Sequence, residues 1–149
     1  MSNKNIDALV PALIMVQLVT KADRPSTWSA SFEGLSPVDL HVLGIVERWP
    51  DVILREIKEY LDVPNSTLTG IVDRLESKGL IERVISNRDR RSYGLALTGR
   101  GRALREEQRQ IRREAAARML AALDSDAERD EFVRLMGKIS DGISTEVKK

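Results

Sequence analysis

Residues Val63 to Thr98, VPNSTLTGIVDRLESKGLIERVISNRDRRSYGLALT, decide the fold that we predict for this chain. An apolar stripe at helical spacing predicts an amphipathic helix over Ser66 to Lys78, with the stripe formed by Leu68, Ile71, Val72 and Leu75. Gly79 suits the end of that helix, because glycine readily adopts the left-handed conformation found there. Two short apolar runs follow at 80–85 and 93–98, and they predict two strands joined by a tight turn.

A short amphipathic helix is predicted just before this stretch, over Ile53 to Leu61. Two helices joined by a tight turn present the second helix to a DNA major groove. The outward face of that second helix carries hydroxyl side chains and Arg74, which can bond bases or phosphates. Asp73 would repel phosphate, so we expect it to orient Arg74, Arg83 or a neighbouring residue. The alternative is an ordinary solvated polar face.

The turn between the predicted strands is rich in arginine: Arg88, Asp89, Arg90 and Arg91 follow one another. Arginine at the tip of a two-stranded ribbon suits the narrow minor groove, where negative potential is concentrated. We expect Asp89 to pair with an arginine of the turn and fix its direction. The alternative is a solvated charged hairpin. Helix, turn, helix and ribbon together predict a mainly α fold with a small two- or three-stranded β wing, organised as a winged helix-turn-helix domain over about 36–98.

A further helix is predicted to begin at Ser36, which can act as its N-cap, and to stop before Pro50. His41 lies inside this helix, and we expect a partly buried, satisfied side chain there rather than a ligand. The connection 23–35 before it has no helical period. Its Trp28 and Phe32 either pack the connection onto the domain or form the wall of a small-molecule pocket, and the sequence leaves both readings open.

Two terminal helical segments flank the predicted domain, at about 5–22 and 99–146. The N-terminal one is apolar on several sides and is either an ordinary core helix or a helix shared with a second subunit. The C-terminal one carries Phe132, Leu135, Met136, Ile139 and Ile143 at helical spacing. Because neither segment has a domain of its own to cover, we predict that both are dimerisation helices of a single protomer spanning 1–149.

Composition excludes several classes of function. The chain of 149 residues is 42% hydrophobic and 32% charged, has a formal net charge of +1, and contains no cysteine and one histidine. Disulfides, thiolate zinc sites and cysteine-based redox sensing are therefore excluded, and we expect no metal and no cofactor. Without a glycine-rich phosphate loop or a distinctive carboxylate pair, the chain does not read as an enzyme.

No secretory signal or membrane-spanning run is apparent in the sequence, so we expect a cytoplasmic protein without a membrane partner. The arginines of the turn leave a second interpretation, a winged-helix module that contacts an acidic protein instead of an operator. The turn has few apolar neighbours, which favours phosphate over a hydrophobic protein interface.

The order of elements and the turn resemble the MarR family of bacterial transcriptional regulators. The family pattern is Asp, any residue, Arg, then a strand that ends in Leu-Thr and a Gly three residues on. Asp89, Arg91, Leu97, Thr98 and Gly101 match this pattern. The stretch 75–81, LESKGLI, is also similar to the family's end of the recognition helix and first strand.

The resemblance implies a homodimer whose terminal helices form the interface and whose two winged lobes bind a palindromic operator in double-stranded DNA, most often as a repressor. It implies that Arg91 enters the minor groove with Asp89 as its orienting partner, while Ser66, Thr67, Thr69 and Arg74 lie in the recognition helix. Some members bind small aromatic or phenolic acids in a cleft between the dimer helices and the lobe. Trp28 and His41 would be near such an effector pocket.

Overall fold

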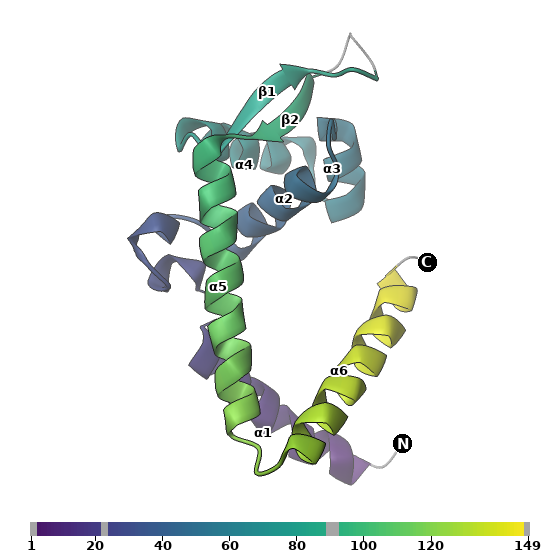
Figure 1. The fold of residues 1–149 in the computed structure, drawn as a ribbon. Helices are drawn as coiled ribbons and strands as arrows, with labels where there is room; N and C mark the ends of the chain where they lie inside the picture. The colour runs from purple at the N-terminus through teal and green to yellow at the C-terminus, as the bar shows by residue number, and fades with distance from the viewer. Residues whose placement is uncertain (1–2, 22–23, 89–92, 148–149) are drawn as a thin grey trace. The chain divides into compact units, whose positions relative to one another are not determined.

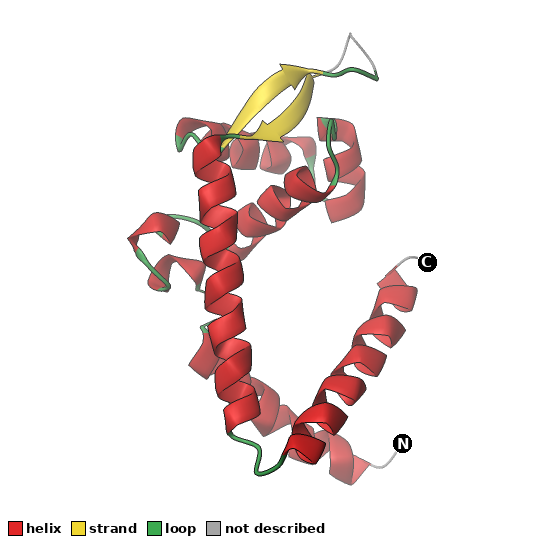
Figure 2. Ribbon diagram, viewed as in Figure 1, coloured by secondary structure: helices red, strands yellow, loops and turns green. Residues whose placement is uncertain are grey.

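The computed structural model describes residues 3–21, 24–88 and 93–147, and these residues are mainly helical with one small antiparallel sheet (Figure 1). This architecture confirms the predicted fold class, mainly α with a small β wing. Figure 2 shows the two strands as a ribbon beside the helix that precedes them in the chain and at the start of the helix that follows them. The elements in chain order are α1 Asn3–Thr20, α2 Pro37–Arg48, α3 Leu54–Leu61, α4 Asn65–Ser77, β1 Ile81–Ile85, β2 Tyr93–Leu97, α5 Gly99–Ala121 and α6 Asp126–Val147.

The chain divides into two compact units, Met1–Arg109 and Gln110–Lys149. The first unit contains α1 to α4, the sheet and the first part of α5. The second contains the rest of α5 and α6. The winged lobe therefore lies wholly within the first unit, and the functional site is described there.

The core of the lobe forms where α2 packs against β2, α3 against α4 and β2, and α4 against β1. The predicted apolar stripe of α4 faces this core, since Leu68, Ile71, Val72 and Leu75 are all buried. Their partners from other elements include Leu43, Ile57, Ile81 and Leu95, each almost completely shielded from solvent. A single apolar core thus holds the helix-turn-helix against the sheet.

Strands β1 and β2 pair from Ile81 opposite Leu97 to Ile85 opposite Tyr93. A third chain segment touches the sheet at one point, an isolated bridge between Ile53 and Gly94. Ile53 is also the N-cap of α3, so the chain turns into a helix before it can extend the pairing. The predicted two- or three-stranded wing is therefore two-stranded with one additional bridge.

The predicted helix ends are confirmed by local hydrogen bonds. Ser36 and Asp39 form a capping box at the start of α2, in which each side chain accepts a bond from the other's backbone N–H. Gly79 follows α4 with φ of +66°, the left-handed conformation that glycine adopts at low cost. At the start of α5, the Gly101 N–H donates to Thr98 Oγ1 over 3.0 Å.

The connection between α1 and α2 is more regular than the sequence suggested. It contains two short 3-10 helices, η1 Pro25–Thr27 and η2 Ala30–Phe32, each a single turn too short to produce a helical period in the sequence. The Phe32 side chain is fully buried, and the Trp28 ring packs edge-on against it with a centroid distance of 5.2 Å. These contacts support the interpretation that the aromatic residues pack the connection onto the lobe.

The terminal helices expose their apolar side chains in the single chain. Leu9, Leu13 and Leu18 of α1 are 55%, 52% and 62% exposed, so the interpretation of α1 as an ordinary core helix is wrong for the protomer. Val133 and Ile139 of α6 are similarly exposed, at 56% and 52%. None of the described helices combines the length and the apolarity that crossing a membrane requires.

The close approach of α5 to the sheet gives a first prediction. A Cβ on Gly101 would collide with the Leu80 carbonyl oxygen and lie 3.0 Å from its carbonyl carbon, both backbone atoms that cannot turn away. We expect Gly101→Ala to destabilise the protein by about 1–3 kcal/mol in urea unfolding. A Cβ on Gly70 meets no atom within 4 Å, so Gly70→Ala should not destabilise it. Equal stability of the two variants would contradict this packing.

Candidate nucleic-acid interface

The helix-turn-helix is formed by α3, a turn at residues 62–64 and α4. Asp62 in the turn has φ of +49°, and Pro64 stands directly before the first residue of α4. The Leu68 N–H donates to the Pro64 carbonyl, which continues the helical bonding into the turn. The turn therefore leaves the outer face of α4 open along its first residues.

The exposed start of α4 carries small polar side chains. Ser66, Thr67 and Thr69 are all exposed, and the Thr69 hydroxyl donates to the Asn65 carbonyl over 2.9 Å. Gly70 has open space where a Cβ would stand. A base edge or a phosphate can thus approach the backbone closely at this end of the helix. The N–H groups there also favour negative charge such as that of phosphate.

Arg74 is held by an acidic partner within the lobe. Its Nη2 donates to Asp39 Oδ1 over 2.7 Å, and the Asp39 side chain is completely buried while that of Arg74 is 43% exposed. The sequence analysis placed Arg74 among the DNA-binding residues. The observed ion pair directs its guanidinium toward α2, so its contact with DNA stays a prediction that the geometry does not favour.

Asp73 pairs with Arg83 of β1 and not with Arg74. Arg83 Nη2 lies 2.8 Å from Asp73 Oδ1, and Arg83 Nε lies 3.1 Å from Glu76 Oε2. Arg83 was one of the partners expected for Asp73, and it is the arginine that pairs with Asp73 in the structure. The pair joins the outer face of α4 to the first strand of the wing.

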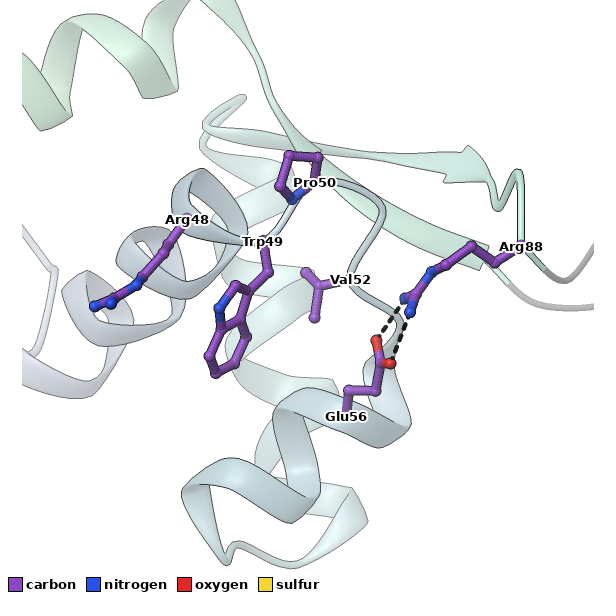
Figure 3. Close-up of a pocket in the computed structure, with 6 residues that line it drawn as sticks. All are labelled: Arg48, Trp49, Pro50, Val52, Glu56 and Arg88. Atoms are coloured by element: carbon purple, nitrogen blue, oxygen red, sulfur yellow. Dashed lines mark hydrogen bonds and ion pairs between the residues drawn. The ribbon is translucent and has the colours of Figure 1, made fainter. Parts of the chain in front are cut away.

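Arg88 lies beyond the end of β1, where the chain enters the wing turn. It donates two hydrogen bonds to the Glu56 carboxylate, over 3.0 and 2.7 Å (Figure 3). A third hydrogen bond goes to the Asp51 carbonyl. Arg88 and Glu56 line a pocket of about 410 Å³ together with Arg48, Trp49, Pro50 and Val52. The other predicted wing residues, Asp89, Arg90 and Arg91, lie outside the described residues.

The pair with Arg88 changes the acidity of Glu56. Hydrogen bonds from Arg88, and then from the Ile53 N–H, lower the pKa of the Glu56 carboxyl from 4.5 to about 2. The same pair raises the pKa of the Arg88 guanidinium. Glu56 is therefore a carboxylate at all ordinary pH values, so both partners of the ion pair are charged under those conditions.

Trp28 and His41, the predicted effector residues, lie in two separate aromatic contacts. Trp28 packs on Phe32 and donates from its indole Nε1 to the Lys21 carbonyl over 3.1 Å. His41 is exposed and packs edge-on against Tyr60 of α3, with ring centroids 5.9 Å apart. The expectation of a partly buried His41 is wrong, because α2 turns this position away from the core. An effector-binding role for the two residues stays a prediction.

Comparisons with known proteins now identify the family. A sequence model of the MarR family matches residues 35–93. The chain is 32% identical over 117 residues to the HTH-type transcriptional repressor MdtR of Bacillus subtilis. The matched stretch covers 78% of this chain and 75% of that protein. It is 30% identical over 106 residues to the repressor Rv2887 of Mycobacterium tuberculosis, over 71% and 76% of the two chains.

The chain belongs to the MarR family. Membership confirms the resemblance noted in the sequence and the prediction of a DNA-binding transcriptional regulator. Solved structures agree in fold. YusO of Bacillus subtilis is 26% identical with a TM-score of 0.75, over 95% and 98% of the two chains. FabT of Streptococcus pneumoniae, crystallised with DNA, is 24% identical with a TM-score of 0.75, over 99% and 98%.

Sequence reasoning missed Asp51 and Glu56, which hold the wing from outside it. Neither stands in a motif, and each acquires its role only from residues more than thirty positions away in the chain. The signal available for Glu56 was its place three residues after Ile53, the N3 position of a helix. Asp39 stands in the first turn of α2, three residues after the predicted cap Ser36, but its bond to Arg74 cannot be read from that position.

The lowered pKa of Glu56 gives a pH prediction. The stabilisation from its pair with Arg88 is fully present above the ordinary pKa of 4.5 and is lost as the pH falls toward 2. We expect Glu56→Gln to be less stable than the native protein at pH 6, with the difference shrinking steadily toward pH 2. Urea unfolding at each pH measures this difference. A gap of constant size, or one that widens in acid, would be inconsistent with the pair.

Glu59→Gln is the matched control for the pH experiment. Glu59 lies on the same helix and faces Arg55 at 4.0 Å, with both side chains largely exposed. The substitution removes the same charge but leaves Arg88 untouched. The pH-dependent part of the Glu56→Gln effect should therefore be absent from Glu59→Gln.

Proposed function

We propose that this MarR-family regulator is a homodimeric repressor that binds a palindromic operator and acts in the cytoplasm. Repression is supported by its likeness to MdtR and Rv2887, both named as transcriptional repressors. The observation that carries DNA binding is the exposed, small-polar start of α4 beside a two-stranded wing. This combination provides a helix that can enter a major groove and a ribbon that can follow the adjacent backbone.

The proposed contacts divide between the helix and the wing. Ser66, Thr67 and Thr69 can bond base edges or phosphates from the start of α4, where the helix dipole also favours phosphate. Arg90 and Arg91, with Asp89 as the orienting acid, are the proposed minor-groove residues of the wing turn. The helix would then supply most of the base selection, and the arginines would respond to groove width.

DNA binding is tested with the native protein and fragments selected from its source genome. We expect nanomolar binding of selected fragments, measured by fluorescence anisotropy, with log affinity falling linearly as log salt concentration rises. Arg91→Ala should weaken specific binding by on the order of 1–3 kcal/mol and lower the salt slope by about one. Arg118→Ala, which removes one positive charge from α5, should leave both quantities nearly unchanged. Normal operator binding by Arg91→Ala would refute the wing assignment.

Homodimerisation through the terminal helices is the second part of the proposal. The exposed apolar side chains of α1 and α6 would be covered by a second copy of the chain, since isolated apolar faces of this extent are costly in water. Two lobes related by a twofold axis would then place their α4 helices on half-sites about one DNA turn apart.

Sedimentation measures the assembly directly. We expect a dimer at micromolar concentration, and a monomer when Leu9 and Leu13 are both replaced by Asp, because charge at these positions cannot be buried without a partner. Circular dichroism should show that the monomeric variant keeps its helical content. A native protein that sediments as a folded monomer, or a double variant that stays dimeric, would overturn this interface.

Release of the operator by a small aromatic or phenolic acid is the third part of the proposal. This part rests on the family membership. A compound that binds the folded protein should raise its melting temperature and lower operator affinity in the same concentration range.

A further inference from the structure

Asp51 fixes the course of the chain where it leaves β1. Asp51 lies in the turn between α2 and α3 with φ of +61°, an uncommon conformation for a residue other than glycine. Its Oδ2 accepts hydrogen bonds from Ser86 Oγ over 3.0 Å, from the Asn87 N–H over 2.9 Å and from the Arg88 N–H over 3.2 Å. One carboxylate oxygen therefore holds three consecutive residues between the end of β1 and the wing turn.

The Arg88 side chain also binds to residues 51–56. Its guanidinium donates to both oxygens of the Glu56 carboxylate (Figure 3). Its Nη2 also donates to the Asp51 carbonyl over 2.7 Å. Glu56 is itself held in place, because its Oε2 accepts from the Ile53 N–H over 3.0 Å. A two-point contact between planar groups restricts direction as well as distance. The side chain of Arg88 is thus directed toward α3 while its backbone belongs to the wing.

The second strand is attached at the same place. The Leu95 N–H donates to the Val52 carbonyl over 3.0 Å, and Gly94 forms the isolated bridge with Ile53. A Cβ on Gly94 would lie 2.7 Å from Asp51 Oδ1, so the two chain segments are in close contact. Residues 51–56 therefore hold β2 and the segment that follows β1.

We infer that Asp51, Glu56 and Arg88 are positioning residues that set the direction of the wing relative to the helix-turn-helix, and that Arg88 acts on DNA affinity through Glu56 and not by contact with phosphate. An isolated two-stranded ribbon is marginally stable by itself and needs such attachment to keep a direction. Arg90 and Arg91 follow Arg88 by two and three residues, so the attachment sets where the wing turn begins. The DNA part of this inference rests on the proposed function.

The sign of one substitution separates positioning from direct contact. If Arg88 contacts phosphate, Glu56→Gln would release a competing carboxylate and tighten operator binding. If Arg88 positions the wing, Glu56→Gln should weaken operator binding by about tenfold, as Arg88→Ala does, and the double variant should be no weaker than either single one. Glu59→Gln is the control for loss of a negative charge from α3, and it should bind at least as tightly as the native protein.

Two further measurements use the chemistry of Arg88. Arg88→Lys keeps the charge but loses the two-point geometry, so we expect nearly the loss found for Arg88→Ala. The slope of log affinity against log salt should stay at the native value in Arg88→Ala, whereas loss of a phosphate contact lowers it by about one. Tighter binding by Glu56→Gln than by Glu59→Gln, native affinity in Arg88→Lys, or a reduced slope in Arg88→Ala would each overturn the inference.

Amide hydrogen exchange tests the attachment without DNA. In Glu56→Gln and Arg88→Ala, the amides of Asn87, Arg88 and Leu95 should exchange roughly tenfold faster than in the native protein, while those of α2 keep their native rates. Unchanged exchange at the wing would overturn the inference whether or not DNA binds. If the native protein binds no operator but the wing amides respond as expected, the proposed function fails while the attachment of the wing stands.

Discussion

The buried carboxylate of Asp39 is the interaction on which the geometry of the lobe depends. A charge without solvent is costly unless polar partners surround it. Asp39 has three: the Ser36 N–H at 2.7 Å, the Ser36 hydroxyl at 2.8 Å and Arg74 at 2.7 Å. The first two fix the start of α2, and the third reaches α4. Because the same carboxylate caps α2 and binds Arg74, α4 is held at a defined position against α2.

Several arginines of the lobe pair with acidic side chains of other elements in the same chain. Arg74, Arg83 and Arg88 each meet an acidic side chain of the lobe. Arg105 and Arg109 of α5 do the same with Glu47 of α2, at 3.0 and 2.8 Å. These arginines join elements of the lobe to one another. A net charge of +1 is consistent with such pairing, and it shows why total charge is a poor guide to nucleic-acid binding in this protein.

The lobe and the terminal helices solve different physical problems. In the lobe, the apolar stripe of α4 is buried within the same chain, and the surface that remains is polar. In α1, leucines that would normally seek a core stay more than half exposed. The apolar side chains of α1 therefore form a second apolar surface, which the single chain does not bury. A second copy of the chain covers that surface in the proposed dimer, and it would also pair two DNA-reading helices.

The sequence by itself determined the features that depend on neighbours along the chain. The stripe of α4, the Ser36 cap, the stop at Gly79 and the two strands all follow from periodicity or from the conformational preference of one residue, and all are present in the structure. The motif that begins at Asp89 and Arg91 likewise identified the family, although these two residues themselves lie outside the described part of the chain.

Only the tertiary structure decided which charges pair. Arg74 and Asp39 are 35 residues apart in sequence, and Arg88 and Glu56 are 32 apart, so no local pattern connects them. Two arginines that looked equally suited to DNA were thereby directed toward α2 and α3, and Asp73 met Arg83. His41 turned outward for the same reason, since the packing of α2 against the sheet selects which of its faces is covered. Local preferences define the helices, but the partners of a long charged side chain are set by whichever elements the core brings within its reach.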